Sequence, residues 1–95
     1  MKQPCVYIIT NYQRTVLYTG VTSDMVKRVY QHIEGSIDGF SKRYCCKYLI
    51  YYEIIELMEQ AILREKQIKA YRREKKEALI NAMNPDWKDL YESIL

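Results

Sequence analysis

Glycine, proline and cysteine are scarce in this chain, and each scarcity excludes a class of protein. Three Gly and two Pro among 95 residues exclude collagen-like and linker-rich chains. The three cysteines show no CxxC spacing, and Cys45 and Cys46 are adjacent, which argues against a disulfide framework and a structural zinc site. The single histidine, His32, limits a zinc site further. We therefore expect small buried or half-buried thiols in a reducing cytosol.

Long apolar segments are also missing. No run approaches the roughly 20 apolar residues of a membrane span, and the N-terminal residues lack the long apolar core of a signal peptide. The apolar fraction, 48%, is nevertheless too high for intrinsic disorder. We expect one soluble, cytoplasmic domain over residues 1–95, with a short helical tail at 84–95 and no membrane partner.

Charge and aromatic residues are unevenly distributed. The net charge is only +3, but residues 62–77 carry seven basic residues against three acidic ones. Such a run is either a solvated helix face or a surface that faces phosphates. Ten tyrosines accompany one Phe and one Trp. Because a tyrosine hydroxyl must be solvated or hydrogen-bonded, we expect several of these rings at the edge of the core or in a cleft.

The first half of the chain predicts a β-hairpin and a helix. Residues 5–10 and 16–21 are rich in β-branched and aromatic residues, and residues 11–15 between them form a turn. Alternation places Tyr7 and Tyr18 where the hairpin brings them to one surface. Residues 22–24 supply helix-capping side chains, and Gly35 ends a helix whose apolar stripe contains Met25, Val26, Val29, Tyr30 and Ile33. Arg28 and His32 lie together at one margin of that stripe.

The second half predicts a strand and two helices. A polar loop over 35–46 leads to a third strand at 47–55, a helix from Leu57 to Arg73, and a shorter helix from Glu74 to Met83. The first helix has an apolar face that includes Leu57, Met58, Ala61, Ile68 and Tyr71. Glu65 falls inside this face, where a carboxylate must be paired or bound to a cation. Arg64 and Arg72 are candidates for a structural ion pair. The predicted order is ββαβαα, an α+β fold.

The polar residues exclude several chemistries and indicate one. No P-loop, GxGxxG or GxSxG motif is present, and the acidic residues do not cluster as a two-metal site requires. One carboxylate with an arginine, a histidine and phenols suits phosphoryl chemistry instead. Glu65 would hold one divalent ion, Arg28 would stabilise the added negative charge, and His32 or a tyrosine would relay a proton.

Each of these residues also has a simpler interpretation. Tyr7 and Tyr18 are typical of a cross-strand packing pair, and Arg28 with His32 is typical of a solvated helix edge. Glu65 is compatible with an ion pair as well as with a metal site. Only their joint occurrence favours a catalytic site.

These residues, taken in order, resemble the GIY-YIG nuclease superfamily. The segments that carry the resemblance are Cys5-Val6-Tyr7, Tyr18-Thr19-Gly20, R28-x3-H32, the loop FSKRY, the strand LIYYE and A61-x3-E65-x3-K69. They span nearly the whole chain, and the pattern is most similar to small bacterial members that consist of the domain alone. The first motif reads Cys-Val-Tyr instead of Gly-Ile-Tyr, which keeps the tyrosine and changes two packing positions.

The resemblance implies a fold, a reaction and roles for individual residues. The fold would be a three-stranded antiparallel sheet flanked by helices. Tyr7 would position or deprotonate the attacking water, and Tyr18 would be a hydrogen-bonding or relay partner at the cleft. Gly20 would let substrate or backbone come close. Arg28 would stabilise the transition state, His32 would serve the proton relay, and Glu65 would bind one Mg²⁺ or Mn²⁺. An asparagine of the family site has no certain match, although Asn81 and Asn84 both lie in range.

The predicted function is therefore a metal-dependent endonuclease that hydrolyses phosphodiester bonds of duplex or branched DNA in repair or recombination. Lys42, Arg43 and Lys69 are predicted to contact the substrate. The alternative is a nucleic-acid-binding module without catalysis, favoured by the basic segment 62–77 and by tyrosines that can stack on bases. A protein-interaction role for the C-terminal segment is a third hypothesis, but this amphipathic segment is expected to fold back on its own domain.

Overall fold

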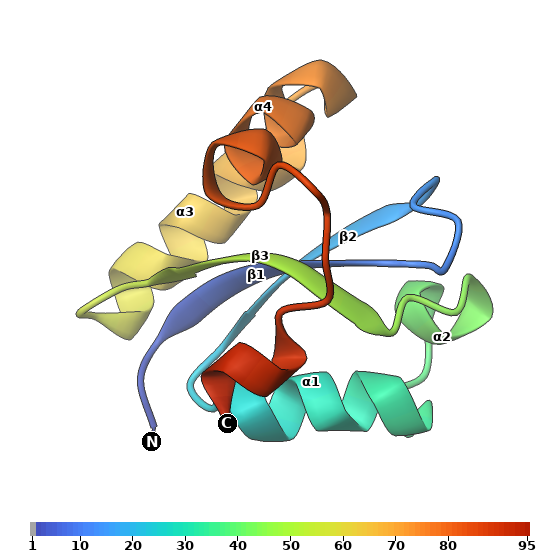
Figure 1. The fold of residues 1–95 in the computed structure, drawn as a ribbon. Coiled ribbons are helices and arrows are strands. Elements are labelled where there is room, and N and C mark those ends of the chain that lie inside the picture. Colours follow the sequence, from blue (N-terminus) through green and yellow to red (C-terminus); the bar gives the residue numbers. More distant parts are fainter. Residues whose placement is uncertain (1) are drawn as a thin grey trace.

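A computed structural model describes residues 2–95 and contains a three-stranded antiparallel sheet with helices on both faces (Figure 1). The sheet order is β2-β1-β3. The elements are β1 (Cys5–Thr10), β2 (Leu17–Thr22), α1 (Met25–Glu34), α2 (Phe40–Arg43), β3 (Tyr48–Ile54), α3 (Met58–Ala70), α4 (Arg73–Met83) and the 3₁₀ helix η1 (Tyr91–Ile94).

Local sequence signals explain the hairpin and the first helix. Asn11 organises the β1–β2 turn, since its side-chain oxygen accepts hydrogen bonds from the backbone N–H groups of Thr15 and Val16. Asp24 caps α1 by accepting a bond from the N–H of Lys27, and Gly35 ends the helix in the left-handed conformation. The predicted hairpin and the predicted limits of this helix are confirmed.

The central strand β1 is buried at all six positions because helices cover both faces of the sheet. On one face, Cys5, Tyr7 and Ile9 pack with Met25 and Val29 of α1. On the other face, the intervening β1 side chains pack against α3 and α4, in a cluster formed by Val6, Ile8, Ile50, Ala61, Ile68 and Ile80. The predicted alternation along β1 is therefore correct.

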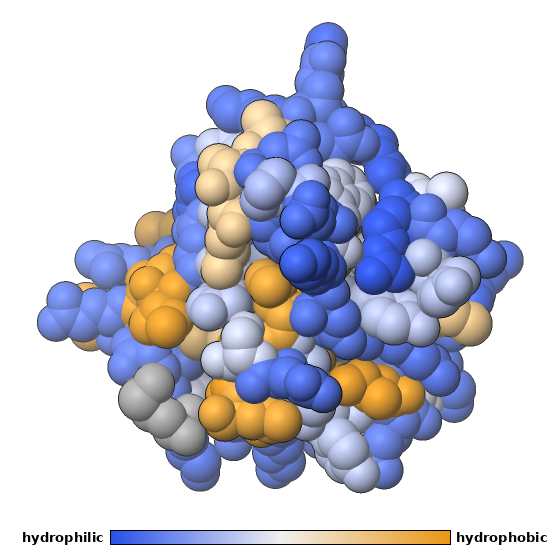
Figure 2. All heavy atoms as spheres, viewed as in Figure 1, coloured by the Kyte–Doolittle hydropathy of each residue, from blue (hydrophilic) through white to orange (hydrophobic). Residues whose placement is uncertain are grey.

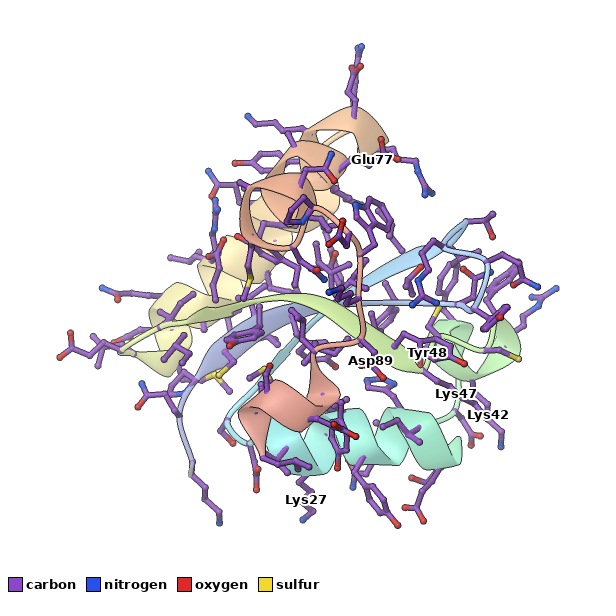
Figure 3. The ribbon with its side chains drawn as sticks, in the orientation of Figure 1. Lys27, Lys42, Lys47, Tyr48, Glu77 and Asp89 are labelled. Atoms are coloured by element: carbon purple, nitrogen blue, oxygen red, sulfur yellow. The ribbon has the colours of Figure 1, made fainter. Side chains whose placement is uncertain are left out.

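The C-terminal segment folds back along the outer edge of β3. The N–H of Leu90 donates to the carbonyl of Leu49, and Asp89 accepts a bond from the N–H of Leu49. Asn84 spans the same edge, because its amide donates to the carbonyls of Ile50 and Lys88. These bonds satisfy backbone groups that an edge strand would otherwise expose. Figure 3 shows Asp89 beside β3.

Three expectations about the helices need correction. The loop over 35–46 contains the short helix α2. The helix predicted over 57–73 is shorter, since the extended backbone of Tyr71 and Arg72 separates α3 from α4. Leu57 and Met58, expected on the core face, are 47% and 37% exposed, because the first turn of α3 lies where the chain leaves the end of the sheet.

The surface is mainly hydrophilic with separate hydrophobic patches, as Figure 2 shows for one face. Tyr30, expected on the apolar stripe of α1, contributes to this surface because it is 49% exposed. Among residues 2–95, no helix is both long enough and apolar enough to cross a membrane. Cys5 and Cys46 are buried and Cys45 is exposed, and all three are free thiols.

The two asparagines at the end of α4 provide a test of this architecture. We expect Asn84→Ala to lower the free energy of unfolding by about 2 kcal/mol, because it leaves buried backbone groups of β3 and the tail without partners. Asn81→Ala is the matched control, since the exposed Asn81 only accepts a bond from the indole of Trp87. Urea unfolding measures both variants. Equal losses would contradict the assigned role of Asn84.

Candidate active site

Tyr7 and Gly20 form the floor of the site. They are direct partners in the β1–β2 register, and the Tyr7 ring lies over Gly20 with no exposed surface. A Cβ atom at position 20 would overlap Cζ and the phenol oxygen of Tyr7. Gly20 was expected to let substrate or backbone come close. The close approach is made instead by the Tyr7 ring, which fills that space, and Gly20 is buried.

A buried chain of hydrogen bonds begins at the Tyr7 phenol. Its oxygen lies 2.8 Å from Nε2 of His32, and Nδ1 of His32 lies 2.9 Å from Oγ of Ser41 in α2. His32 and Ser41 are both almost fully buried. Burial, aided by the positive charge of Arg28, lowers the pKa of His32 to about 4. At neutral pH the imidazole is therefore uncharged and has one nitrogen that accepts and one that donates.

Arg28, one turn before His32 on α1, faces the same phenol. Burial is the main cause that raises the pKa of Tyr7 far above its usual value, and the charges of Tyr18 and Glu65 raise it further. Arg28 opposes this shift because its positive charge favours the phenolate. Arg28 also lines an open polar hollow with Lys2, Lys27 and Gln31, so its guanidinium is reachable from solvent.

Glu65 comes to this site from α3, on the other side of the sheet. Its carboxylate is only 13% exposed and pairs with Lys69 one turn later, with 3.1 Å between Nζ and Oε2. The expected partners Arg64 and Arg72 are not used. Arg64 instead makes a paired bond to Glu53 of β3, with both nitrogen–oxygen distances at 2.8 Å. The charge of Glu65 thus acts on Tyr7 while the half-exposed Lys69 pairs with the carboxylate.

Tyr18 connects the site to α2. Its ring centroid lies 5.5 Å from that of His32 and 6.2 Å from that of Phe40, on which it stacks. Phe40 contacts Tyr44, and the Arg43 guanidinium lies over the Tyr44 ring. These α2 side chains are exposed, as is Lys42, which pairs with Asp38. Figure 3 shows Lys42 and Lys47 at this end of the molecule.

The structure brings Tyr7, Tyr18, Arg28, His32 and Glu65 together, and leaves two tentative residues elsewhere. Asn81 and Asn84 lie at the end of α4, where Asn81 bonds to Trp87 and Asn84 bonds to β3. Ser41 was not identified from the sequence. Its only signal was its position within the segment FSKRY, where no periodicity marks a buried residue.

The donor set fits one hard divalent cation better than a metal cluster. Residues 2–95 contain no group of three or more His, Cys, Asp or Glu side chains placed to hold a metal. An ion at Glu65 would therefore take one protein carboxylate, and water and substrate oxygens would supply its other ligands. Mg²⁺ is commonly bound in this way, whereas structural Zn²⁺ requires several nitrogen or sulfur ligands.

Comparison with known proteins identifies the family. The model of the GIY-YIG catalytic domain matches residues 3–78, which include every polar residue of the site. The chain belongs to the GIY-YIG family. The GIY-YIG domain implies a nuclease-type function and a nucleic-acid substrate.

Relatives of this GIY-YIG chain are small proteins named UPF0213. One from Haloquadratum walsbyi is 36% identical over 66% of this chain and 71% of the relative. One from Staphylococcus aureus is 39% identical over 67% of this chain and 78% of the relative. The solution NMR structure of a UPF0213 protein from Bacillus halodurans has a TM-score of 0.59 at 24% identity, and covers 92% of both chains. The similarity confirms the α+β fold with its three-stranded antiparallel sheet.

The contact between Gly20 and Tyr7 predicts strong coupling between two substitutions. We expect Gly20→Ala to destabilise this GIY-YIG domain by about 1–3 kcal/mol, because the new methyl group overlaps the buried ring. Tyr7→Leu removes Cζ and the hydroxyl, so Gly20→Ala should cost much less in that background. A double-mutant cycle measured by thermal and urea unfolding gives the coupling. Additive effects would contradict the packing described here.

The lowered pKa of His32 predicts a dependence of stability on pH. Unfolding releases His32 to an ordinary pKa near 6.5, so the unfolded chain binds more protons between about pH 4 and 6.5. The stability due to neutral His32 is therefore complete above that range and declines by about 2–3 kcal/mol as pH falls through it. Urea unfolding of the wild type and of His32→Gln isolates this contribution. Parallel pH profiles for the two proteins would contradict it.

Proposed function

We propose that the protein is a divalent-metal-dependent DNA endonuclease that hydrolyses phosphodiester bonds with one metal ion. The observation that carries the proposal is the convergence of two phenols, an arginine and a carboxylate from β1, β2, α1 and α3. Tyr18, Arg28 and Glu65 all act electrostatically on the Tyr7 hydroxyl, which bonds to the neutral His32. Perturbed titratable groups gathered in this way are characteristic of catalytic sites. We assign the reaction to DNA repair or recombination in the cytoplasm.

Arg28 is the residue suited to stabilise the transition state. A phosphodiester under attack gains negative charge on its non-bridging oxygens, and a guanidinium can donate two hydrogen bonds to them. Arg28 is half-buried, so its charge is weakly screened, and the polar hollow beside it leaves room for phosphates. Lys2 and Lys27 line the same hollow and add positive charge there, and the acidic Asp24 also lines it and offsets part of that charge.

Tyr7 and His32 are suited to move the proton that attack by water releases. Tyr7 is fully buried and holds its proton at neutral pH, so it cannot act as a free phenolate base. His32 lies within hydrogen-bonding distance and is uncharged, so its free nitrogen can take the phenol proton. The phenol can then take a proton from the attacking water once substrate binding admits that water to the buried hydroxyl. Tyr18 is half-buried between His32 and the exposed Phe40, and these contacts support our proposal that it orients the attacking water.

Glu65 is the residue suited to hold Mg²⁺ or Mn²⁺, which supplies charge neutralisation at a phosphoryl oxygen when bound. The ion pair with Lys69 must open for Glu65 to bind a cation. The released ammonium is then free to contact a phosphate of the substrate. Lys42 and Arg43, exposed on α2 at the other side of Tyr18, are proposed to contact the DNA backbone.

A nuclease assay tests this function directly. Plasmid, duplex and branched DNA are incubated with the protein and Mg²⁺ or Mn²⁺, and cleavage products are separated on gels. We expect cleavage that chelation abolishes, and rates at least 100-fold lower for Glu65→Ala and Arg28→Ala. Glu59→Ala, which changes an exposed acidic residue on the same helix as Glu65, is the matched control and should leave the rate unchanged. Wild-type rates in Glu65→Ala would overturn the assignment.

Lys69→Met adds a readout for the cation site that does not depend on cleavage. Removal of the ammonium frees the Glu65 carboxylate, so Mn²⁺ binding measured by calorimetry or electron paramagnetic resonance should tighten several-fold. Glu65→Ala should abolish that binding. If Lys69→Met and Glu65→Ala both bind Mn²⁺ as the wild type does, Glu65 is not the metal ligand.

A second candidate function is nucleic-acid binding without catalysis. The observation that favours it is the exposed group on α2, where Phe40, Tyr44 and Arg43 lie in contact beside the site. Aromatic and guanidinium faces stack on bases, and the basic residues of 62–77 would add contacts to phosphates. Salt-sensitive DNA binding that needs no divalent ion, with no cleavage of any substrate, would favour this function over the first.

A further inference from the structure

Ser41 is a buried polar residue in an otherwise exposed segment. Within α2 it is the buried residue, while Phe40, Lys42 and Arg43 are exposed. A serine near the start of a helix usually bonds to the helix backbone. The side chain of Ser41 instead reaches Nδ1 of His32 at 2.9 Å, which is its one side-chain hydrogen bond within residues 2–95. The hydroxyl of Ser41 therefore bonds to the histidine and not to the backbone of its own helix.

The hydrogen-bonding groups around His32 determine which nitrogen carries the proton. Within residues 2–95, Nε2 of His32 is the one hydrogen-bond partner of the fully buried Tyr7 phenol. The positive charge of Arg28 acts on the same phenol and favours an orientation in which the oxygen lone pairs face Arg28. The phenol proton then points to Nε2 of His32, at 2.8 Å, which must accept it. Since a neutral imidazole has one protonated nitrogen, the proton lies on Nδ1 and is donated to Oγ of Ser41.

We propose that Ser41 is a positioning residue that holds His32 in the tautomer protonated on Nδ1. In this tautomer Nε2 is free to accept the proton of Tyr7. With the proton on Nε2, the buried phenol proton would have no acceptor among the described residues, and Nε2 could not take it. The serine thereby gives the short helix α2 a function in the site. Its effect on cleavage rests on the proposed nuclease function, whereas its effect on His32 does not.

The tautomer can be observed directly because the chain contains a single histidine. Long-range ¹H–¹⁵N correlation spectra of uniformly ¹⁵N-labelled protein at neutral pH distinguish a protonated ring nitrogen from an unprotonated one. We expect Nδ1 of the wild type to be protonated and Nε2 to be unprotonated. A wild-type spectrum with the proton on Nε2 would overturn the proposal, and this measurement needs no variant.

Three variants separate positioning from packing. Ser41→Ala removes the acceptor, so both tautomers should be populated, and the rate of DNA cleavage should fall at least 10-fold with little change in DNA affinity. Ser41→Thr keeps the hydroxyl and should restore both the tautomer and most of the rate. Ser36→Ala, which removes an exposed hydroxyl that bonds to the Gln31 carbonyl, is the control and should change neither.

The two readouts distinguish the failure of this inference from the failure of the nuclease function. If the wild type cleaves no DNA but Ser41→Ala still redistributes the His32 tautomers, the nuclease function is wrong and the positioning role is correct. If the wild type cleaves DNA and Ser41→Ala leaves the tautomer unchanged, the positioning role is wrong.

Discussion

The structure of the site depends on the Tyr7 phenol, which is buried between Gly20 and His32. The ring needs a glycine opposite it on β2, and its hydroxyl needs a partner in a region without water. His32 is the hydrogen-bond partner of that hydroxyl, and Ser41 is the partner of the second imidazole nitrogen. Three elements separated in sequence are thereby fixed relative to one another by a buried polar chain, which has few alternative arrangements once all its members are paired.

The edge strand β2 explains how residues from opposite faces of the sheet reach one point. α1 covers the face that carries Tyr7, and α3 packs against the other face. A carboxylate on α3 would normally be shielded from that phenol by the sheet. The glycine on β2 lets the Tyr7 ring extend over the outermost strand, where Arg28 and Glu65 both act on its hydroxyl. If Gly20 were on a central strand, further strands would lie between α1 and α3. Arg28 and Glu65 could then not both act on the Tyr7 hydroxyl.

The sequence predicted the parts of the site that follow from local periodicity. Tyr7 and Tyr18 could be placed on one face from strand alternation, Arg28 and His32 from helical spacing, and the limits of α1 from Asp24 and Gly35. A glycine is needed at position 20 because the strand register places Tyr7 opposite it. No local sequence signal specifies that register. Ser41 lies in a polar segment with two glycines, where no hydrophobic period distinguishes buried from exposed positions.

For Glu65, the ion-pair partners expected from the sequence differ from the partner in the structure. The apolar face of α3 correctly indicated a shielded carboxylate, and arginines nearby suggested its partner. Arg64, however, is drawn to Glu53, whose carboxylate also accepts the Tyr51 hydroxyl and so offers a stronger, bidentate site. Lys69 remains, one turn after Glu65 in the orientation that favours such a pair. A half-exposed lysine is a weak and replaceable partner, whereas a buried arginine pair would have held the carboxylate away from any cation. With Arg64 bound to Glu53 of β3, the half-exposed Lys69 is the ion-pair partner of Glu65 in this structure.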